Sequence, residues 1–193
     1  MAVAAWAAAT AAHAWTPQPG DGPGPYAEVE PDYQGHRSGV IHGFVDIPAP
    51  AARVWRLMLD CTEARRMVPF VRSCRVLERD PGGAWDVREH VVDYGFPFPR
   101  IRSVFRSEYQ PLRLVRFHCL PNGELKVCDG EWRLEPRPGG VRVIYENRLT
   151  SPFPAPAALV RGRMRHDVLG ALAALKRLAL EPDIRPVPPS PAR

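Results

Sequence analysis

The chain has almost no lysine, although it is basic overall. Of its 26 basic residues only Lys126 and Lys176 are lysines, and the net charge is +5. The arginines that make up the rest are spread along the chain and form no dense basic run. Nucleic-acid-binding proteins concentrate basic residues on one face or motif, so we expect no nucleic-acid partner. A mildly basic surface can still assist contact with an anionic membrane.

Paired cysteine motifs are also missing. The four cysteines contain no Cys-x-x-Cys pair, which argues against a zinc site or a redox dithiol. We therefore expect no metal and no cofactor. Cys119 and Cys128 flank a predicted hairpin turn at Asn122-Gly123. We expect them either to form a disulfide in an exported protein or to fill the core as small apolar residues.

The sequence motifs of several common enzyme classes are absent. The chain contains no nucleophile elbow, no P-loop, no dinucleotide-binding glycine pattern and no His-Glu-x-x-His pair. These absences exclude several enzyme classes, but the protein can still be an enzyme of another class.

No apolar run reaches the length of about 20 residues that a membrane-spanning helix needs. The Ala-rich segment 1–14 ends in Ala12-His13-Ala14, which fits the small-x-small rule for signal-peptide cleavage. No Lys or Arg precedes its apolar part. We expect an exported protein, periplasmic or secreted, with a signal peptide at 1–14 whose true start lies upstream. The alternative is a cytoplasmic protein with a disordered Ala-rich leader.

Proline, by contrast, is abundant, with 23 residues in the chain. Residues 15–37 are rich in Pro and Gly and show no periodicity, so we predict a linker or an extended arm. Residues 181–193 are Pro-rich and are predicted to be a disordered tail. One domain over residues 38–180 is therefore expected.

The stretch from Phe44 to Pro69 predicts a strand followed by two short helices. The strand ends at Pro48, and apolar residues recur at helical spacing directly after Pro50. Further strands are predicted at about 70–78, 83–93, 101–109, 112–120, 125–135 and 140–149. A long helix is predicted from about 155 to 180, with an apolar stripe of Val160, Met164, Val168, Leu172 and Leu175.

Alternation along the strands predicts which side chains face inward. On the strands at 83–93 and 101–109, the inner sets are Trp85, Val87, Glu89, Val91 and Asp93, and Ile101, Ser103, Phe105, Ser107 and Tyr109. On the last two strands they are Cys128, Gly130, Trp132 and Leu134, and Val141, Val143, Tyr145, Asn147 and Leu149.

These segments resemble the START-like, or SRPBCC, superfamily of helix-grip folds, in particular its polyketide cyclase/dehydrase and coenzyme Q-binding group. The resemblance rests on DIPAPAARVWRLMLD with MVPFVRSCRVLER, on GEWRLEP with VRVIYENRL, and on SPFPAPAALVRGRMRHDVLGALAALKRLA. It implies an α+β fold in which a curved antiparallel sheet of six or seven strands wraps around a long C-terminal helix, with a hydrophobic pocket between them. Family members bind lipids, quinones, sterols, polyketides or hormones, and a minority catalyse cyclisation or dehydration.

Glu89 is the candidate for a catalytic role. On the predicted inner face, beside Trp85, its carboxyl is buried, and burial raises the pKa of a carboxyl. It would act there as a general base or as a polar anchor for the ligand. The alternative is a register one residue out, which puts Glu89 in solvent and turns Arg88 and His90 inward.

The remaining candidate residues concern ligand binding. Tyr145 and Asn147 are predicted to hydrogen-bond a quinone or ketone oxygen, or else to satisfy buried backbone groups. The lining is expected to include Trp85, Phe105, Phe117, Trp132, Met164 and Val168, with ordinary core packing as the alternative role of the aromatic residues. Phe96 and Phe98, in a loop at 94–99, are predicted either to gate the pocket or touch a membrane, or to form a packed lid.

Together these features predict a non-enzymatic carrier or sensor of a hydrophobic small molecule, such as a lipid, a quinone or a polyketide-like compound. A polyketide cyclase/aromatase-like enzyme that uses Glu89, Tyr145 or Asn147 is the first alternative. A protein-interaction module with a pocket filled by its own side chains is the second. The expected partners are the hydrophobic molecule and, transiently, a membrane surface.

Overall fold

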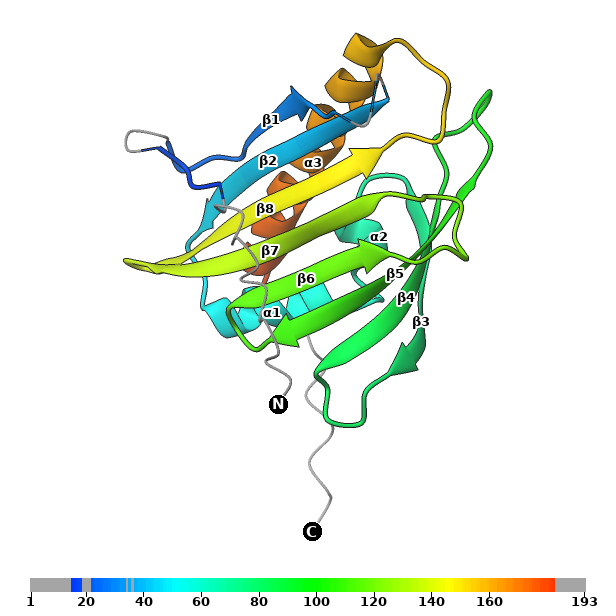
Figure 1. The fold of residues 1–193 in the computed structure, drawn as a ribbon. Coiled ribbons are helices and arrows are strands. Elements are labelled where there is room, and N and C mark those ends of the chain that lie inside the picture. The colour runs from blue at the N-terminus through cyan, green and yellow to red at the C-terminus, as the bar shows by residue number, and fades with distance from the viewer. Residues whose placement is uncertain (1–14, 19–21, 34, 36, 183–193) are drawn as a thin grey trace, which may run out of the picture.

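The computed structural model describes residues 15–18, 22–33, 35 and 37–182. An eight-stranded antiparallel sheet curves around one long helix (Figure 1). The strands are β1 (Tyr26–Pro31), β2 (Ser38–Ile47), β3 (Val71–Arg79), β4 (Trp85–Val92), β5 (Ile101–Gln110), β6 (Leu114–Cys119), β7 (Cys128–Arg137) and β8 (Gly140–Thr150). The helices are α1 (Ala51–Leu59), α2 (Ala64–Met67) and α3 (Ala157–Leu180). The predicted helix-grip fold is confirmed, with one strand more than expected.

The order of strands across the sheet is β1-β2-β8-β7-β6-β5-β4-β3. The early strand β2 therefore pairs with the last strand β8, from Ser38 opposite Thr150 to Ile47 opposite Val141. From β3 to β8 each strand pairs with the next one in the chain. Helices α1 and α2 carry the chain from β2 to β3 at the far edge, and they lie on the same side of the sheet as α3 (Figure 1).

Strand β1 lies inside the segment predicted to be a linker, so that prediction was wrong for residues 26–31. β1 pairs antiparallel with β2, from Tyr26 opposite Phe44 to Pro31 opposite Gly39. Ala27 is buried and Val29 packs against the core, whereas Glu30 is exposed. The surrounding prolines hid this short alternation. An edge strand tolerates proline because one side of its backbone needs no partner.

The apolar stripe predicted for the C-terminal helix forms the buried side of α3. All five predicted residues are buried there, and Leu178 extends the stripe by one turn. The helix comes close to β2 at Gly43, where a Cβ atom would lie 3.1 Å from the Leu172 side chain and 3.2 Å from that of Val168. The missing side chain of Gly43 thus lets α3 pack directly on the sheet.

Two disulfides pair all four cysteines. Cys61–Cys74 joins the turn between α1 and α2 to β3, and Cys119–Cys128 joins the end of β6 to the start of β7. Their Cα atoms are 5.4 Å and 5.1 Å apart, within the normal range for a disulfide. The second disulfide is one of the two roles that were predicted for Cys119 and Cys128. The first pair was not predicted, because only the position of α2 brings Cys61 next to β3.

Candidate functional site

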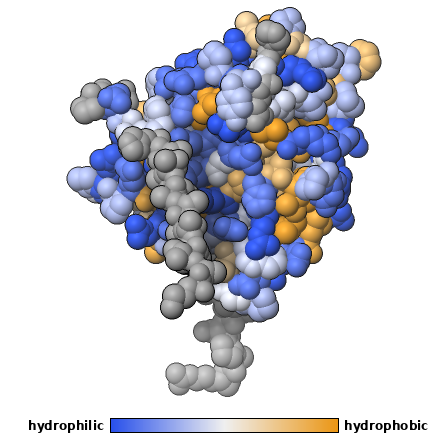
Figure 2. All heavy atoms as spheres, in the orientation of Figure 1, coloured by the Kyte–Doolittle hydropathy of each residue, from blue (hydrophilic) through white to orange (hydrophobic). Residues whose placement is uncertain are grey.

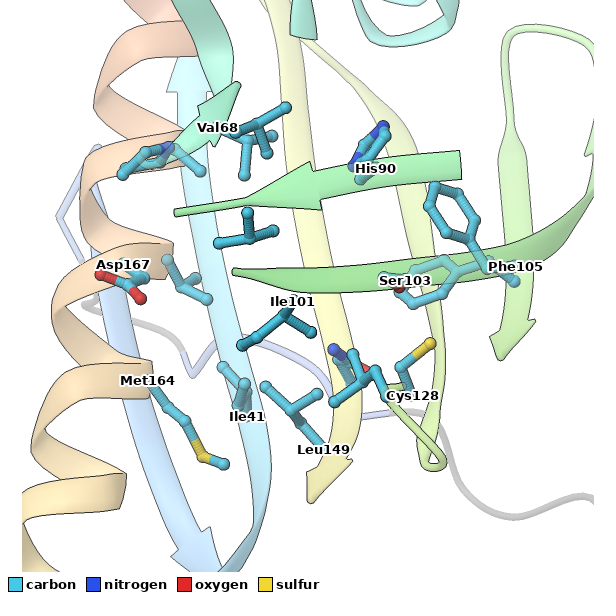
Figure 3. Close-up of a pocket in the computed structure, with 18 of the residues that line it drawn as sticks. Ile41, Val68, His90, Ile101, Ser103, Phe105, Cys128, Leu149, Met164 and Asp167 are labelled. Atoms are coloured by element: carbon cyan, nitrogen blue, oxygen red, sulfur yellow. The ribbon is translucent and has the colours of Figure 1, made fainter. Parts of the chain in front are cut away.

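A cavity of about 570 Å³ lies between α3 and the inner face of the sheet. Met164 of α3 and Ile41 of β2 face it from one side, and His90, Ser103 and Phe105 face it from the other (Figure 3). Its wall is mostly apolar. The volume lies within the range of about 300–1,000 Å³ that is usual for small-molecule sites.

Most of the predicted lining residues do face this cavity. Those in its wall are Phe105, Phe117, Trp132, Tyr145, Asn147, Met164 and Val168. They come from strands β5 to β8 and from α3. On β5 the whole predicted inner set lines the cavity, because alternation along that strand is unbroken. Whether these residues contact a ligand stays a prediction.

An aromatic cluster forms the part of the wall built by β5 to β8. Tyr145 is at its centre, with its ring 4.3 Å from Trp132 and stacked at 6.3 Å on Phe117. Phe117 meets Phe105 edge to face at 6.4 Å. The Phe117 ring lies over Gly130, where a Cβ atom would come within 2.8 Å of it. Gly130 therefore gives this ring its place against the sheet.

Trp85 and Glu89 do not line the cavity, and the prediction that placed them there was wrong. Pairing with β5 sets the orientation of β4: Arg88 lies opposite Phe105, and His90 lies opposite Ser103. Residues directly opposite each other share a face of the sheet, so Arg88 and His90 face inward. The valines that alternate with Glu89 suggested the reverse. The alternative register weighed for Glu89 turned Arg88 and His90 inward, as observed.

The environment of Glu89 is that of an outward-facing ion pair. Arg75 Nη2 donates to its carboxylate at 2.7 Å, and Arg102 donates to the other oxygen. These hydrogen bonds hold the pKa of Glu89 below its ordinary value, the opposite of the raised pKa predicted. Glu89 is 5% exposed because the two arginines cover it. An ionised carboxylate outside the cavity cannot serve as the general base for a molecule inside it.

Arginines also cover other outward-facing side chains of the sheet. The Arg106 guanidinium lies 3.9 Å from the centre of the Trp85 ring, which explains how a tryptophan can face outward here. Hydrophilic residues cover much of the surface on the side of the molecule seen in Figure 2, with hydrophobic patches between them. The outer face of β4 is thus shielded by charged groups rather than by a second layer of structure.

A buried ionic cluster closes the cavity near α1. Arg88 donates to both oxygens of Asp86 at 2.9 and 3.0 Å and to the carbonyl oxygen of Leu59 at 2.9 Å. Tyr109 donates to Asp86 at 2.7 Å. Burial, followed by the contact with Asp86, raises the pKa of Tyr109, although Arg88 opposes this. The cluster ties the end of α1 to β4 and β5, and its positive charge is already neutralised.

His90 is an inward-facing group that the preferred strand orientation missed. Its Nε2 atom is buried and has no hydrogen-bond partner among the described residues. Burial, with a smaller effect of the Arg88 charge, lowers the pKa of His90 to about 4, so the imidazole is neutral at pH 7. Its ring meets Phe105 edge to face at 4.9 Å. The orientation of His90 can be inferred from β5: alternation along β5 turns Ser103 inward, and His90 lies opposite Ser103 in the sheet.

Tyr145 and Asn147 form a polar pair within the apolar wall. Asn147 Nδ2 donates to the Tyr145 hydroxyl oxygen at 2.8 Å. Both residues are more than nine-tenths buried, and Asn147 Oδ1 has no partner in the described part of the chain. Burial raises the pKa of Tyr145, so the hydroxyl keeps its proton. The pair therefore offers a bound molecule the Tyr145 hydroxyl hydrogen as a donor and Asn147 Oδ1 as an acceptor.

The predicted gate loop lies at one end of the cavity and is only partly packed. Phe98 lines the cavity and has its ring 5.0 Å from that of Phe153, yet it is 47% exposed. Phe96 is fully exposed and is not part of the wall. Behind the loop, Tyr94 donates to Asp167 at 3.1 Å, and Arg163 pairs with Asp167 at 2.9 Å. The loop is thus anchored at Tyr94 and presents an apolar tip at Phe96.

Two other kinds of feature are absent from the described residues. Those residues contain no group of three or more His, Cys, Asp or Glu side chains placed to hold a metal ion. None of the helices they form is both long enough and apolar enough to cross a membrane.

Comparison with known proteins gives the same fold. A family model described as polyketide cyclase/dehydrase and lipid transport matches residues 47–176. A search of curated proteins finds no significant match.

Solved structures with the same architecture come from several bacteria. The STAR-related lipid transfer protein of Xanthomonas axonopodis is 18% identical, with a TM-score of 0.64 over 80% of this chain and 99% of that one. The protein TTHA0849 of Thermus thermophilus is 25% identical, with a TM-score of 0.59 over 72% and 95% of the two chains. The Zhui aromatase/cyclase of Streptomyces sp. R1128 is 17% identical, with a TM-score of 0.59 over 74% and 93%.

Proposed function

Because the chain belongs to the polyketide cyclase/dehydrase and lipid transport family, we propose that it binds and carries a hydrophobic small molecule in its cavity without changing it chemically. The observation that supports this most is the apolar cavity of about 570 Å³. The two arginines in its wall are already paired, Arg88 with Asp86 and Arg163 with Asp167. A cavity that is apolar and internally neutralised favours uncharged ligands, because burying an unpaired charge is costly.

Tyr145 and Asn147 are the proposed anchor for the ligand. Their free donor and acceptor can bind a neutral oxygen group, such as the carbonyl of a quinone or the keto and hydroxyl oxygens of a polyketide-like compound. Leaving a buried acceptor unpaired costs about 1–3 kcal/mol, so a ligand that pairs with Asn147 Oδ1 recovers that free energy. A carboxylate or phosphate finds no unpaired cation in the described wall.

A cyclase-like enzyme is the second candidate, and one observation favours it. His90 presents a neutral imidazole to the cavity with an unpartnered nitrogen, and such a group can accept a hydrogen bond from a hydroxyl of a bound polyketide-like compound and orient it. The version of this hypothesis that relied on Glu89 is not supported, since Glu89 faces outward. The filled-pocket interaction module has less support than either, because the cavity is open enough to hold a ligand.

We also propose that the gate loop touches a membrane while the cavity is loaded or emptied. Phe96, Phe98 and Leu159 are exposed apolar side chains at or near this end of the cavity. Arg72 and Arg100 are largely exposed next to the loop, each paired with Asp93. An apolar tip beside basic side chains suits an anionic lipid surface. Phe96→Ser should weaken binding to anionic vesicles and slow lipid transfer between them, whereas Leu77→Ser, an exposed leucine on β3, should have no effect.

Native mass spectrometry with lipid extraction tests the central proposal. The protein, purified without detergent, should carry a hydrophobic molecule or take one up from a total lipid extract. If it carries none and takes up none, the carrier hypothesis is overturned. If the bound molecule is converted to another compound during incubation, and His90→Gln stops the conversion, the enzyme hypothesis replaces it.

A further inference from the structure

The outer surface of the sheet holds Trp15 in a defined site, away from the cavity. The Trp15 backbone N–H donates to Glu146 Oε2 at 3.1 Å, and Arg133 donates to its carbonyl oxygen. The indole ring stacks on His42, with ring centres 5.2 Å apart, and lies parallel to Tyr26 at 6.5 Å. Both main-chain polar groups of Trp15 and its ring are therefore engaged by β1, β2, β7 and β8.

A buried imidazole nitrogen lies beside the same carboxylate oxygen. His42 Nδ1 is 3.6 Å from Glu146 Oε2, and within the described chain this buried nitrogen has no hydrogen-bond partner. A peptide N–H at Trp15 has one hydrogen to donate, and Glu146 receives it. An ammonium group at the same position has three and also carries a positive charge, so it can form an ion pair with Glu146.

The sequence directly before Trp15 has the pattern of a processing site. Ala12-His13-Ala14 places small residues one and three positions before Trp15 and follows an apolar Ala-rich stretch. The two disulfides are a separate indication of export, because disulfides persist mainly in oxidising compartments outside the cytosol.

We propose that the chain is cleaved between Ala14 and Trp15 during export, and that the new α-ammonium group of Trp15 binds Glu146. A signal peptidase hydrolyses the peptide bond: water adds its oxygen to the Ala14 carbonyl carbon, and the bond to the Trp15 nitrogen breaks. The products are a carboxylate on Ala14 and an amine on Trp15, which is protonated at neutral pH. The former hydrogen bond from the peptide N–H to the Glu146 carboxylate becomes an ion pair with a charged donor, which is stronger.

The groups that face the Trp15 nitrogen set its electrostatics. Glu146 is the nearest anion, and burial of this carboxyl is outweighed by hydrogen bonds and by the Arg133 charge, so its pKa is lowered and it is ionised at neutral pH. Arg133 lies 3.0 Å from Glu146 and 3.4 Å from Glu131, and so shares its charge between two carboxylates. Tyr26 donates instead to Glu28 at 2.9 Å.

The cleavage itself is tested on the untagged protein recovered from its native cells. Intact mass and N-terminal sequencing should show a chain that begins at Trp15. Ala14→Phe, which places a bulky residue directly before the cut, should leave the leader attached, whereas Ala9→Phe should be processed normally. A protein that retains residues 1–14, or one cut elsewhere, would overturn the processing site.

The binding of the new N-terminus needs a separate test. The α-amino pKa of a chain starting at Trp15, followed by NMR, should be raised by about one unit by the adjacent carboxylate. Glu146→Gln should abolish that rise, whereas Glu131→Gln, the matched change one strand away, should leave most of it. Glu146→Gln should also lower the melting temperature of the chain starting at Trp15 more than that of a chain extended by Ala14. An α-amino pKa at its ordinary value, or equal losses in both chains, would overturn the ammonium site even if cleavage is confirmed.

Discussion

The two halves of the inner sheet surface differ in what covers them. Under β1 and β2 the helix α3 packs directly on the sheet, and Val45, Leu172 and the neighbouring Val143 of β8 are fully buried. Under β4, β5 and β6 the same inner surface faces the cavity, where Phe105 and Phe117 are only partly buried. Figure 1 shows α3 on the β1–β2 side of the curved sheet. One part of the inner surface belongs to the packed core, and the other part forms the cavity wall.

The widths of the elements explain this difference. A helix is about 10–12 Å wide, and neighbouring strands lie about 4.8 Å apart, so one helix covers two or three strands. The remaining strands of an eight-stranded sheet curl towards the helix but are not covered by it. The helices α1 and α2 close the end of the space that is left, rather than fill it.

The largest effect is expected in the buried ionic cluster of the cavity half, where Arg88 pairs with Asp86. Arg88→Leu leaves Asp86 buried without its cation, which should cost about 3–5 kcal/mol of unfolding free energy. Chemical denaturation measures this loss. Arg106→Leu, which removes an arginine from the outer face of β5, is the control and should cost far less. A loss below about 1 kcal/mol for Arg88→Leu would show that the cluster does not hold α1 to the sheet.

The next effect compares the two halves directly. Leu172→Ala in the packed half should cost about 3 kcal/mol, because the dense core around it cannot collapse into the space. Phe117→Ala should lower the free energy of unfolding by less than Leu172→Ala does, although phenylalanine is larger than leucine, since the Phe117 ring already borders an open cavity. Equal or reversed losses in urea unfolding would mean that the cavity half is as tightly packed as the other.

The third effect depends on pH and belongs to the cavity half alone. The pKa of His90 is 6.5 in the unfolded chain and about 4 in the fold. Between these values the unfolded chain holds the extra proton, so stability falls as the pH falls from 6.5 to 4, by up to about 3 kcal/mol. His90→Gln should remove this part of the pH dependence in thermal melts. The exposed His118→Gln should not, and an unchanged slope in the His90 variant would place that histidine in contact with water.

The smallest effect concerns binding rather than stability. Asn147→Leu removes the buried acceptor at similar volume and should weaken binding of 2-naphthol, a neutral apolar fluorophore whose hydroxyl can donate to Asn147 Oδ1, about tenfold, or about 1.4 kcal/mol. Fluorescence titration measures this change. Asn122→Leu in the exposed turn after β6 should bind as the native protein does. Unaltered affinity in this variant would remove Asn147 from the binding site.

Most of the fold could be predicted from local patterns. The stripe on α3 has helical spacing, and β5, β7 and β8 alternate regularly, so their inward faces were predicted correctly. β4 could not be predicted in this way. Its outer face carries Trp85 and two valines, whereas its inner face carries Asp86, Arg88 and His90. On this strand all the apolar residues except Val92 face outward, and only pairing with β5 reveals it.

Contacts between segments distant in the sequence were the other source of error. β1 is short and flanked by prolines, and it is stabilised by pairing with β2 and by the bond from Arg165 to its Ala27 carbonyl. The Cys61–Cys74 disulfide likewise depends on where α2 turns. None of these features has a strong local signal, because the free energy that stabilises them comes from a partner elsewhere in the chain.

The sequence by itself determined the order of the elements from β2 onwards, the buried side of α3 and the inward faces of β5, β7 and β8, since helical and strand periods are local properties of the chain. The tertiary structure alone decided that Glu89 faces outward, that His90 faces inward and that Trp15 is held at Glu146. It also decided that the space beside α3 stays open. The physical reason is that these outcomes depend on strand pairing and on the width of one helix against a wide sheet, and no local pattern of residues encodes either.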